Sequence, residues 1–376
     1  MYSLRGTWMR GGTSKCWLFG SVDVEPLIEQ AGSLDEILVS AFGSGDPRQL
    51  DGVGGGSSTT SKAAIVSRSS EDGIDVDYLF AQVAIGDRKV EWGSNCGNCA
   101  TAIGLYALQQ GLVAIDPVTT VVRMRNRNTG AVLLTEIDTP GGVVPSEGSA
   151  QVAGTSALGV PVGLTFIDLG ADRTRLLPTG AVEDAVELHG SQYRGTMVVA
   201  GAPAALFDAS DLGMTGAETA AEMTERVPLL VELRRSAALL MGLSRPQDPI
   251  THAVPKVGII APPVDYHLED GTLVSAGEYD VCVRMLSMMA PHPSIGLTSA
   301  VAVAAAATVR GGVVDRVVHG ATTSTLRLGT PAGVLAVDVD IAADGNLTSV
   351  TLHRAARRIA TAELFVSAAA TALSIG

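Results

Sequence analysis

This chain has few cysteines, no long apolar run and no apolar segment at its N-terminus, and each shortage excludes a class of protein. Four cysteines among 376 residues are too few for the disulfide framework of a small secreted domain. No apolar run reaches the roughly 20 residues that a membrane-spanning helix needs, since the best candidate, residues 295–309, is short and rich in alanine. The N-terminus lacks the apolar core of a signal peptide. We therefore expect a cytoplasmic protein with reduced thiols.

The net negative charge limits the classes of binding partner that we expect. Acidic residues outnumber basic ones by 39 to 26, which gives a formal net charge of −13. Nucleic acids and anionic membranes repel such a chain, so we expect neither as a partner. Because the chain as a whole is negative, an anionic substrate would need a pocket whose local charge is positive. The chain is rich in glycine, alanine and aliphatic residues, a composition typical of a tightly packed α/β protein, and it is long enough for two domains.

Two segments predict buried central helices. Residues 97–111 carry no charge, repeat apolar residues at helical spacing and end in glycine. Residues 292–311 are nearly free of charge and also end in glycine. Each segment follows short strand-like stretches and a loop of small residues, which suggests an internal duplication. We expect an N-terminal domain over residues 1–189, with the segment 355–376 packing back on it, and a second domain over residues 190–354.

Shorter patterns predict the remaining elements. Apolar alternation indicates strands at residues 16–19, 62–66, 76–84, 88–91, 196–200, 257–261 and 279–285. Residues 201–216 read as a loop, and residues 216–241 as a helix. The arginine-rich stretch 354–364 predicts an amphipathic C-terminal helix with solvated charges.

The cysteine pair at the start of the first central helix has three interpretations. Structural zinc needs four ligands, and neither the other cysteines nor the histidines have that spacing, so we expect no metal. A redox couple is typical of a C-x-x-C pair after a strand at a helix start, but the length and layout of this chain do not suit that class of protein. The third interpretation is one working thiol, Cys96, whose thiolate form the helix N-terminus favours, with Cys99 as a small core residue.

Two glycine-rich turns could bind anions. The loop 51–61 fails both nucleotide-binding patterns, because Ser61 precedes Lys62 where a P-loop has glycine, and Ser57 stands where the dinucleotide motif has its third glycine. The remaining backbone N–H groups and hydroxyls suit a carboxylate, although an ordinary surface turn explains them equally well. The same two interpretations apply to the turn 9–15. His292, just before the second central helix, is either a cap or a functional residue.

Six motifs occur in one order along the chain: MRGGTSK (9–15), GGGSSTTSK (54–62), NCGN (95–98), GAPAALFDASDLGMTG (201–216), PKVGIIAPP (255–263) and RMLSMMAPH (284–292). As a set they resemble the family of 2-methylaconitate cis–trans isomerase, the PrpF type, with its relatives 3-methylitaconate Δ-isomerase and 4-oxalomesaconate tautomerase. The resemblance covers nearly the whole chain. It implies the α/β (α+β) fold of diaminopimelate epimerase: two similar domains, each a curved β-sheet wrapped around a central helix, with the active site between them.

The resemblance also implies site residues. Its catalytic pair falls on Lys62 and Cys96, without saying which is the base and which the acid. Its substrate-binding positions fall on Arg10, Thr13, Ser14, Lys15, Gly56, Ser57, Ser61, Asn95, Gly97, Asn98, Arg284, His292 and Ser294. Two departures stand out: Cys16 replaces the glycine that usually follows the GTSK turn, and the segment RAARR has alanine where the family usually has threonine.

The implied chemistry is proton transfer next to a conjugated carboxylate. Amino-acid epimerases of this fold use a cysteine at each central helix, whereas the second helix here opens with Ser294, which argues against stereoinversion by two thiols. We expect a cofactor-independent isomerase that moves a double bond, or changes its cis–trans geometry, in a small unsaturated di- or tricarboxylate such as 2-methylaconitate or aconitate. The alternatives are a keto–enol tautomerase of the 4-oxalomesaconate type and a non-catalytic carboxylate-binding protein. The resemblance is compatible with a homodimer.

Overall fold

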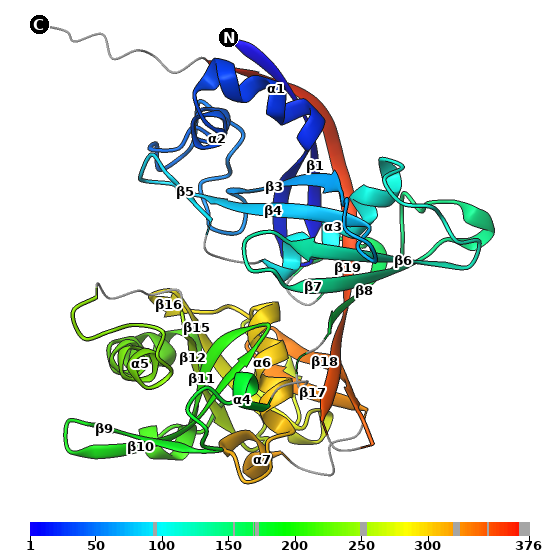
Figure 1. The fold of residues 1–376 in the computed structure, drawn as a ribbon. Coiled ribbons are helices and arrows are strands. Elements are labelled where there is room, and N and C mark those ends of the chain that lie inside the picture. Colours follow the sequence, from blue (N-terminus) through cyan, green and yellow to red (C-terminus); the bar gives the residue numbers. More distant parts are fainter. Residues whose placement is uncertain are drawn as a thin grey trace, which may run out of the picture. The chain divides into compact units, whose positions relative to one another are not determined.

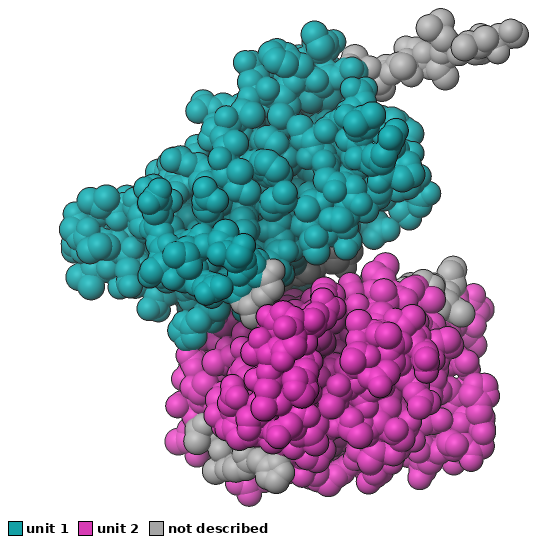
Figure 2. All heavy atoms as spheres, turned by 180° about the vertical axis from the view of Figure 1, so that it is seen from behind, with its two compact units in different colours: residues 1–164, 353–376 teal, residues 165–352 magenta. Residues whose placement is uncertain are grey.

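The chain folds into two compact units, shown in different colours in Figure 2. The structure is a computed structural model that describes residues 1–92, 96–152, 155–167, 169, 173–248, 254–318, 324–343 and 346–367. Unit 1 comprises residues 1–164 and 353–376, and unit 2 comprises residues 165–352. The domain boundary expected between residues 189 and 190 lies inside unit 2, in the turn of a β-hairpin.

Unit 1 is a mixed sheet with one central helix. Its strands are β1 (Tyr2–Gly11), β2 (Ser14–Gly20), β3 (Lys62–Arg68), β4 (Val76–Val83), β5 (Val90–Glu91), β6 (Thr119–Asn126), β7 (Val132–Asp138) and most of β8 (Val160–Ile167). Its helices are α1 (Ser21–Ala31), α2 (Leu34–Phe42), the 3-10 turn η1 (Pro140–Gly142) and the central helix α3 (Gly97–Gln109). β1 pairs antiparallel with β2, β2 runs parallel to β3, β3 pairs antiparallel with β4, β4 runs parallel to β6, and β6 pairs antiparallel with β7.

Unit 2 repeats this arrangement. Its strands are β9 (Asp184–Leu188), β10 (Ser191–Ala200), β11 (Ala202–Asp208), β12 (Lys256–Ala261), β13 (Tyr266–His267), β14 (Leu273–Val274), β15 (Val281–Ser287), β16 (Ala290–Pro291), β17 (Thr325–Thr330), β18 (Gly333–Ile341) and the first part of β19 (Leu347–Val366). Its helical segments are α4 (Arg173–Leu176), η2 (Ala209–Leu212), α5 (Ala220–Leu240), η3 (Ala276–Glu278), α6 (Leu297–Ala307) and α7 (Val313–Val317).

The pairing order shows the duplication that the sequence only suggested. In unit 2, β10–β11 is antiparallel, β11–β12 parallel, β12–β15 antiparallel, β15–β17 parallel and β17–β18 antiparallel, which is the order found in unit 1. The short strands β5 and β16 occupy equivalent places, each just before a central helix. Lys62 begins β3 and Lys256 begins the equivalent strand β12. The two lysines are therefore topological counterparts.

Each central helix is enclosed by its sheet, as predicted (Figure 1). α3 contacts β1, β2, β3, β6 and β7, and α6 contacts β10, β11 and β18. All eleven residues of α6 are buried, since every position of that helix is apolar or a small hydroxyl residue. No described helix is long and apolar enough to cross a membrane.

A glycine allows α3 to lie close against the sheet. A Cβ atom on Gly104 would lie 1.9 Å from Oγ1 of Thr135 on β7 and 2.7 Å from its Cβ. Real atoms do not approach so closely, so only glycine fits here without a shift of the helix or the strand. The helix propensity lost at Gly104 is offset by this closer packing.

The C-terminal segment corrects one expectation. Residues 354–364 form part of the strand β19 and not a helix. β19 pairs antiparallel with β18 through residues 347–352 and with β1 through residues 356–366 (Figure 1, in red). Alanine and arginine favour helix locally, but pairing with two strands from distant parts of the chain satisfies the backbone and overrides that propensity.

The segment predicted as a loop at 201–216 is also partly regular. Residues 202–208 form β11, which pairs with β10 and β12, and η2 follows it. Gly201 alone makes the turn before β11, with φ of +66°. The small residues and the proline concealed a buried strand, because both faces of β11 are covered and no polar alternation remains.

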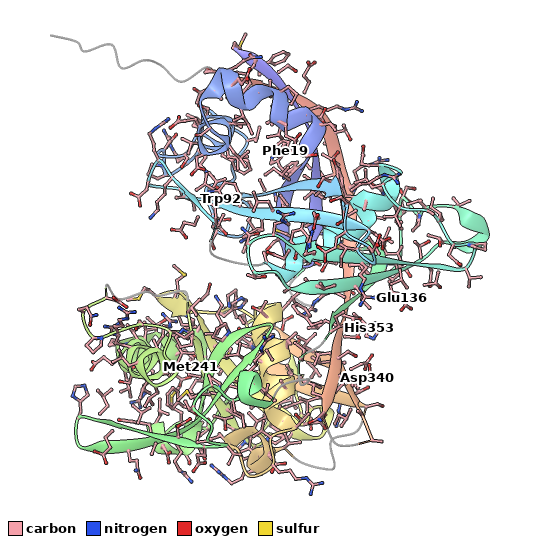
Figure 3. The ribbon with its side chains drawn as sticks, viewed as in Figure 1. Phe19, Trp92, Glu136, Met241, Asp340 and His353 are labelled. Carbon is pink, nitrogen blue, oxygen red and sulfur yellow. The ribbon has the colours of Figure 1, made fainter. Side chains whose placement is uncertain are left out.

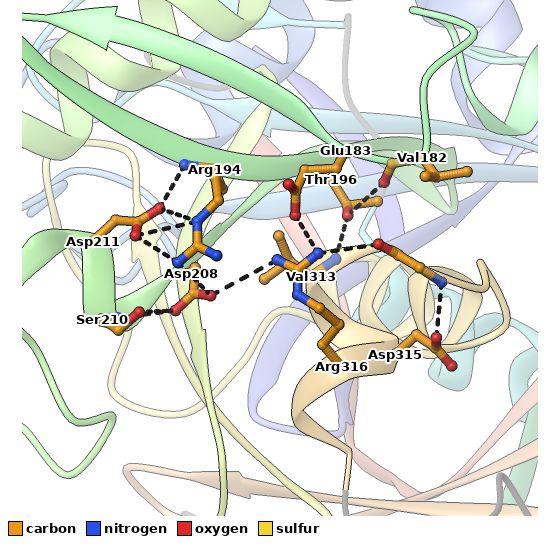
Figure 4. A network of polar contacts seen from close by, with 11 residues as sticks. Val182, Glu183, Arg194, Thr196, Asp208, Ser210, Asp211, Val313, Asp315 and Arg316 are labelled. Atoms are coloured by element: carbon orange, nitrogen blue, oxygen red, sulfur yellow. Dashed lines mark hydrogen bonds and ion pairs between the residues drawn. The ribbon is translucent and has the colours of Figure 1, made fainter.

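A polar network fixes α7 to the sheet of unit 2 (Figure 4). Arg194 on β10 binds Asp211 with two charge-assisted bonds of 2.7 and 2.9 Å, and Arg316 of α7 pairs with Glu183. Thr196 accepts the Val313 backbone N–H at 2.8 Å. This hydroxyl caps α7, whose N-cap residue is a glycine without a side chain that could do so.

Candidate active site

The β1–β2 turn packs directly on the N-terminus of α3. A Cβ atom on Gly11 would lie 2.0 Å from the backbone oxygen of Asn98, and one on Gly12 would lie 2.1 Å from Oδ1 of Asn98. Gly12 also has a φ of +51°. The Asn98 amide donates to the hydroxyls of Thr13 at 3.0 Å and Ser14 at 3.4 Å. The glycines of the first motif thus bring two hydroxyls to the N-terminus of α3.

Lys62 is held at the first position of β3 by its neighbour across the strand pair. Its side chain is buried, with 8% of the residue exposed, and Nζ donates to Oε1 of Gln82 at 2.5 Å. Gln82 stands opposite Lys62 on β4, and its own amide donates to the backbone oxygen of Ser61 at 2.9 Å. Nζ also lies 5.3 Å from the centre of the Phe80 ring. The ammonium therefore has one fixed acceptor and an aromatic face beside it.

Cys96 is the N-cap residue of α3 and is partly buried. Its thiol hydrogen-bonds to that of Cys99 one turn into the helix, and Cys99 in turn contacts the thiol of Cys16 on β2. Cys99 and Cys16 are fully buried. Lys62 interacts electrostatically with both Cys96 and Cys99. The two residues of the predicted catalytic pair therefore lie near one another, within one unit.

The protonation of Cys96 differs from the expectation. The hydrogen bond with Cys99, followed by burial, raises the pKa of the Cys96 thiol well above its ordinary value. Lys62 and the backbone N–H of Cys99 act in the opposite direction without reversing this shift. The helix N-terminus therefore does not make Cys96 a thiolate at neutral pH, and the residue is a thiol that can donate a proton.

The glycine- and serine-rich loop is stabilised by hydrogen bonds with its own neighbouring residues. Gln49, only 2% exposed, donates to Oγ of Ser61 at 2.7 Å and accepts the Gly56 N–H at 2.9 Å. Ser61 is fully buried and also donates to the Val83 backbone oxygen. The Ser57 hydroxyl lies 2.8 Å from that of Thr60. The predicted binding groups at Gly56, Ser57 and Ser61 therefore have internal partners and shape the segment that leads into Lys62.

Arg10 and Lys15 are likewise engaged with their own unit. The Arg10 guanidinium donates to the backbone oxygens of Gly12, Ala157 and Leu158 at 3.1 to 3.2 Å. Burial, and next the nearby Arg357, lower the pKa of Arg10. Nζ of Lys15 lies 4.5 Å from the centre of the Trp8 ring. Both side chains stabilise the β1–β2 turn.

In unit 2, His292 lies at the N-terminus of α6. Nδ1 of His292 accepts the Ser294 backbone N–H at 3.0 Å, and a Cβ on the N-cap residue Gly296 would lie 4.0 Å from Nε2. Burial, followed by the charge of Lys256, lowers the pKa of His292 to about 4. The ring is therefore neutral at pH 7, and because Nδ1 is an acceptor, the proton sits on Nε2. His292 offers one N–H donor beside a helix N-terminus.

Arg284 is enclosed by its own unit. It is only 2% exposed, and its guanidinium donates to the backbone oxygens of Glu218, Val283 and Gly329 at 3.0 to 3.2 Å. It also lies 4.8 Å from the centre of the Tyr266 ring. These backbone partners give Arg284 a structural role inside unit 2, and its expected contact with a ligand stays a prediction.

The structure thus sorts the predicted residues into groups. Around the N-terminus of α3 it gathers Lys62, Cys96, Gly97, Asn98, Thr13 and Ser14. At the N-terminus of α6 it places His292 and Ser294. Asn95 lies outside the described residues. Among the described residues, no group of three His, Cys, Asp or Glu side chains could hold a metal ion.

Sequence reasoning missed Gln82, Gln49 and Lys256. Gln82 is recognisable only from the register of β3 and β4, which brings it opposite Lys62. Gln49 precedes its loop and carries no motif. Lys256 stands inside the PKVGIIAPP motif, and its equivalence to Lys62 follows from the repeated strand order.

Comparison with known proteins gives relatives along nearly the whole chain. A 2-methyl-aconitate isomerase of Shewanella oneidensis is 34% identical over 348 residues, covering 88% of each chain. A (4E)-oxalomesaconate Delta-isomerase of a Novosphingobium species is 34% identical over 362 residues, 96% of each chain. A 3-methylitaconate isomerase of Eubacterium barkeri is 32% identical over 371 residues, again 96% of each chain.

Solved structures agree on the fold. A methylitaconate-delta-isomerase has a TM-score of 0.85 at 29% identity, covering 97% of this chain and 96% of the other. A probable proline racemase from Agrobacterium radiobacter has a TM-score of 0.52 at 12% identity, covering 97% and 93%, a likeness of fold alone. The two units, each a sheet around a central helix, thus form the diaminopimelate-epimerase-like fold that the motifs implied. Because the PrpF protein family matches residues 1–367, and with them both central helices and the Lys62–Cys96 pair, the chain belongs to that family.

Proposed function

We propose that this protein is an isomerase that relocates a double bond, or changes its cis–trans geometry, in a small unsaturated di- or tricarboxylate. The observation that carries the proposal is the pairing of Lys62 with the protonated thiol of Cys96 at the N-terminus of α3. Three relatives named as isomerases of methylaconitate, methylitaconate and oxalomesaconate support the substrate class.

The reaction begins with removal of a weakly acidic proton. A C–H bond next to a double bond that is conjugated to a carboxylate loses its proton to the amine of Lys62. The electron pair spreads over the allylic system to the carboxyl oxygens. Donors that are fixed in advance stabilise that charge more in the transition state than in the substrate. Here such donors are the first N–H groups of α3, at Gly97 and Asn98, with the hydroxyls of Thr13 and Ser14 beside them.

Cys96 completes the transfer. Its raised pKa keeps the thiol protonated, so it donates its proton to the other end of the allylic system. The resulting pair is a thiolate and an ammonium. The interaction between Lys62 and Cys96 stabilises this pair, because the lysine charge favours the thiolate. Passing the proton from Lys62 back to Cys96 restores the enzyme. No net proton is gained or lost.

Unit 2 has an anion-binding position of its own. The Nε2–H of His292 lies beside the N-terminus of α6, and Lys256 contributes positive charge near His292. Arg10, Lys15, Gly56, Ser57 and Ser61 act through the turns that they stabilise.

The test is proton NMR in D₂O with 2-methylaconitate, trans-aconitate, 3-methylitaconate and 4-oxalomesaconate. We expect deuterium to enter the allylic position of at least one acid together with its isomerisation. Line broadening without exchange would identify a carboxylate-binding protein instead. Exchange confined to the oxo acid would favour the tautomerase alternative; the Novosphingobium relative is named for the isomerisation of oxalomesaconate.

A further inference from the structure

Arg354 is a buried arginine that has no partner among the residues that the structure describes. The residue is only 8% exposed and its Nε atom is buried without an acceptor. Among the residues that the structure describes, its guanidinium has no hydrogen bond or ion pair. Burial alone lowers the pKa of Arg354 to about 10, so the group stays charged at neutral pH. A buried charge without a partner is costly, and proteins keep such a group where a ligand completes it.

Nε of Arg10 and of Arg234 is also buried without an acceptor, but each of the other buried arginines donates to at least one backbone oxygen. The guanidinium of Arg10 donates to three backbone oxygens, that of Arg284 to three and that of Arg234 to the Met288 oxygen at 2.7 Å. The guanidinium groups of these structural arginines therefore have backbone oxygens of the protein as hydrogen-bond acceptors. Arg354 lacks them, although it has the same five donors.

The strand register gives the face on which Arg354 lies. Ala356 stands opposite Gly11 in the β1–β19 pair, and a Cβ on Gly11 would meet Asn98 and Ala102 of α3. Side chains alternate along a strand, so Arg354 shares the α3 face with Ala356. Ala355 lies on the opposite face, where its Cβ is 3.3 Å from the position of a Cβ on Gly159.

The same register places Arg354 at the N-terminal end of α3. The Gly12 N–H donates to the Ala355 oxygen at 2.9 Å, so this part of β19 runs beside the β1–β2 turn. That turn packs on Asn98, in the first turn of α3. Figure 3 labels His353, the residue before Arg354, on this strand. Arg354 therefore lies just beyond the last paired residue of β1, on the face of the sheet that α3 covers.

We propose that Arg354 binds a carboxylate group of the substrate at the N-terminus of α3. The inference rests on the proposed function for the identity of the ligand, and it names the residue that recognises one of its carboxylates. A guanidinium presents two parallel N–H groups to a carboxylate, a geometry that a lysine cannot reproduce. Together with the N–H groups of α3 it forms a site for one carboxylate, which orients the acid for proton transfer between Lys62 and Cys96.

The experiment measures binding of tricarballylate, a saturated tricarboxylate that cannot isomerise, by titration calorimetry. Arg354→Met should weaken its binding about 10- to 100-fold, the usual cost of losing charged hydrogen bonds. Arg354→Lys should recover only part of that loss. Arg358→Met, which removes an exposed arginine four residues along the same strand, should bind as the wild type does.

Thermal unfolding without ligand separates this role from a structural one. Because Arg354→Met removes an unpaired buried charge, its Tm should equal or exceed that of the wild type while its affinity falls. A lower Tm with unchanged tricarballylate affinity would assign Arg354 to the fold and overturn the inference. An unchanged affinity at unchanged Tm would also overturn it.

The two proposals fail separately. If the wild type binds tricarballylate through Arg354 but exchanges no deuterium into any acid, the isomerase proposal fails and the carboxylate site stands. Suppose instead that the wild type isomerises an acid, and that Arg354→Met keeps both KM and tricarballylate affinity within about twofold of the wild type. Then the carboxylate-site proposal fails while the isomerase proposal stands.

Discussion

Lys62 and Gln82 face one another across the β3–β4 pair, and the lysine ammonium donates to the glutamine side-chain oxygen at 2.5 Å. The same glutamine is anchored by its amide to the backbone oxygen of Ser61. A neutral acceptor orients the amine without the strong preference for the charged form that a carboxylate would impose. This relationship makes Gln82 a positioning residue for the proposed base.

Substitutions of Gln82 test that role. Gln82→Leu should lower kcat about tenfold through loss of orientation, with little change in KM. Gln82→Glu should be more damaging near neutral pH, since a carboxylate stabilises the ammonium form of Lys62, and its activity should recover as the pH rises. The measurement is a pH–rate profile of each variant. Equal profiles for the two variants would argue against Gln82 as a positioning residue.

Lys62 itself should be required as a base. Lys62→Ala should lower kcat about 10²- to 10⁴-fold, the usual range for a general base. Lys62→Arg keeps the charge, but a guanidinium cannot lose its proton near neutral pH, so this variant should be nearly as inactive. Deuterium exchange into the substrate should stop in both. If Lys62→Arg keeps most of kcat and still exchanges deuterium, Lys62 is a carboxylate anchor and the base lies elsewhere.

Iodoacetamide should label Cys96 before the other thiols, but only at alkaline pH. The pKa of Cys96 is raised first by its hydrogen bond with Cys99, and Cys99, Cys16 and Cys282 are buried. Cys99→Ala removes the main cause of the shift and should bring labelling of Cys96 to lower pH. The measurement is mass spectrometry of the labelled peptides, which gives the extent of Cys96 labelling at each pH in both proteins. Rapid labelling of Cys96 at pH 7 in the unaltered protein would contradict the proposed role as proton donor.

His292 should make stability depend on acid pH. Its pKa of about 4 in the folded chain lies below the ordinary value of about 6.5, so the unfolded chain binds a proton that the folded chain excludes. The contribution of neutral His292 is therefore complete above about pH 6.5 and is lost as the pH falls towards 4. In His292→Gln, Tm measured between pH 7 and 4 should fall less steeply. Parallel curves for the two proteins would remove His292 as the cause.

Gly104→Ala should destabilise unit 1 because its Cβ would overlap Thr135. Overpacking of this kind costs about 1–3 kcal/mol, visible as a lower Tm. Thr135→Ala removes Oγ1, the atom of closest approach, together with Cγ2, and adding it to Gly104→Ala should recover part of the loss. Gly86→Ala serves as the control, because a Cβ there would meet nothing within 4 Å and the backbone has no positive φ. A Gly104→Ala protein as stable as the wild type would show that α3 can shift.

Composition and motif order are enough to predict the two central helices and the proposed catalytic pair. Residues 97–111 and 292–311 are almost without charge, and an element with no polar face must be buried, so two enclosed helices followed from composition alone. The order of the motifs pointed to the family and to Lys62 and Cys96, because those motifs are local and contiguous.

Features that depend on pairing between distant segments could be seen only in the folded chain. Residues 354–364 have helical propensity, but β1 lies some 350 positions earlier and its hydrogen bonds make them a strand. The same register puts Gln82 opposite Lys62 and Arg354 on the face of α3. The pKa of Cys96 and the enclosure of Arg284 likewise depend on groups that are near only after folding. Local propensity and motif spacing carry no information on such contacts, since desolvation and charge interactions act through space and not along the chain.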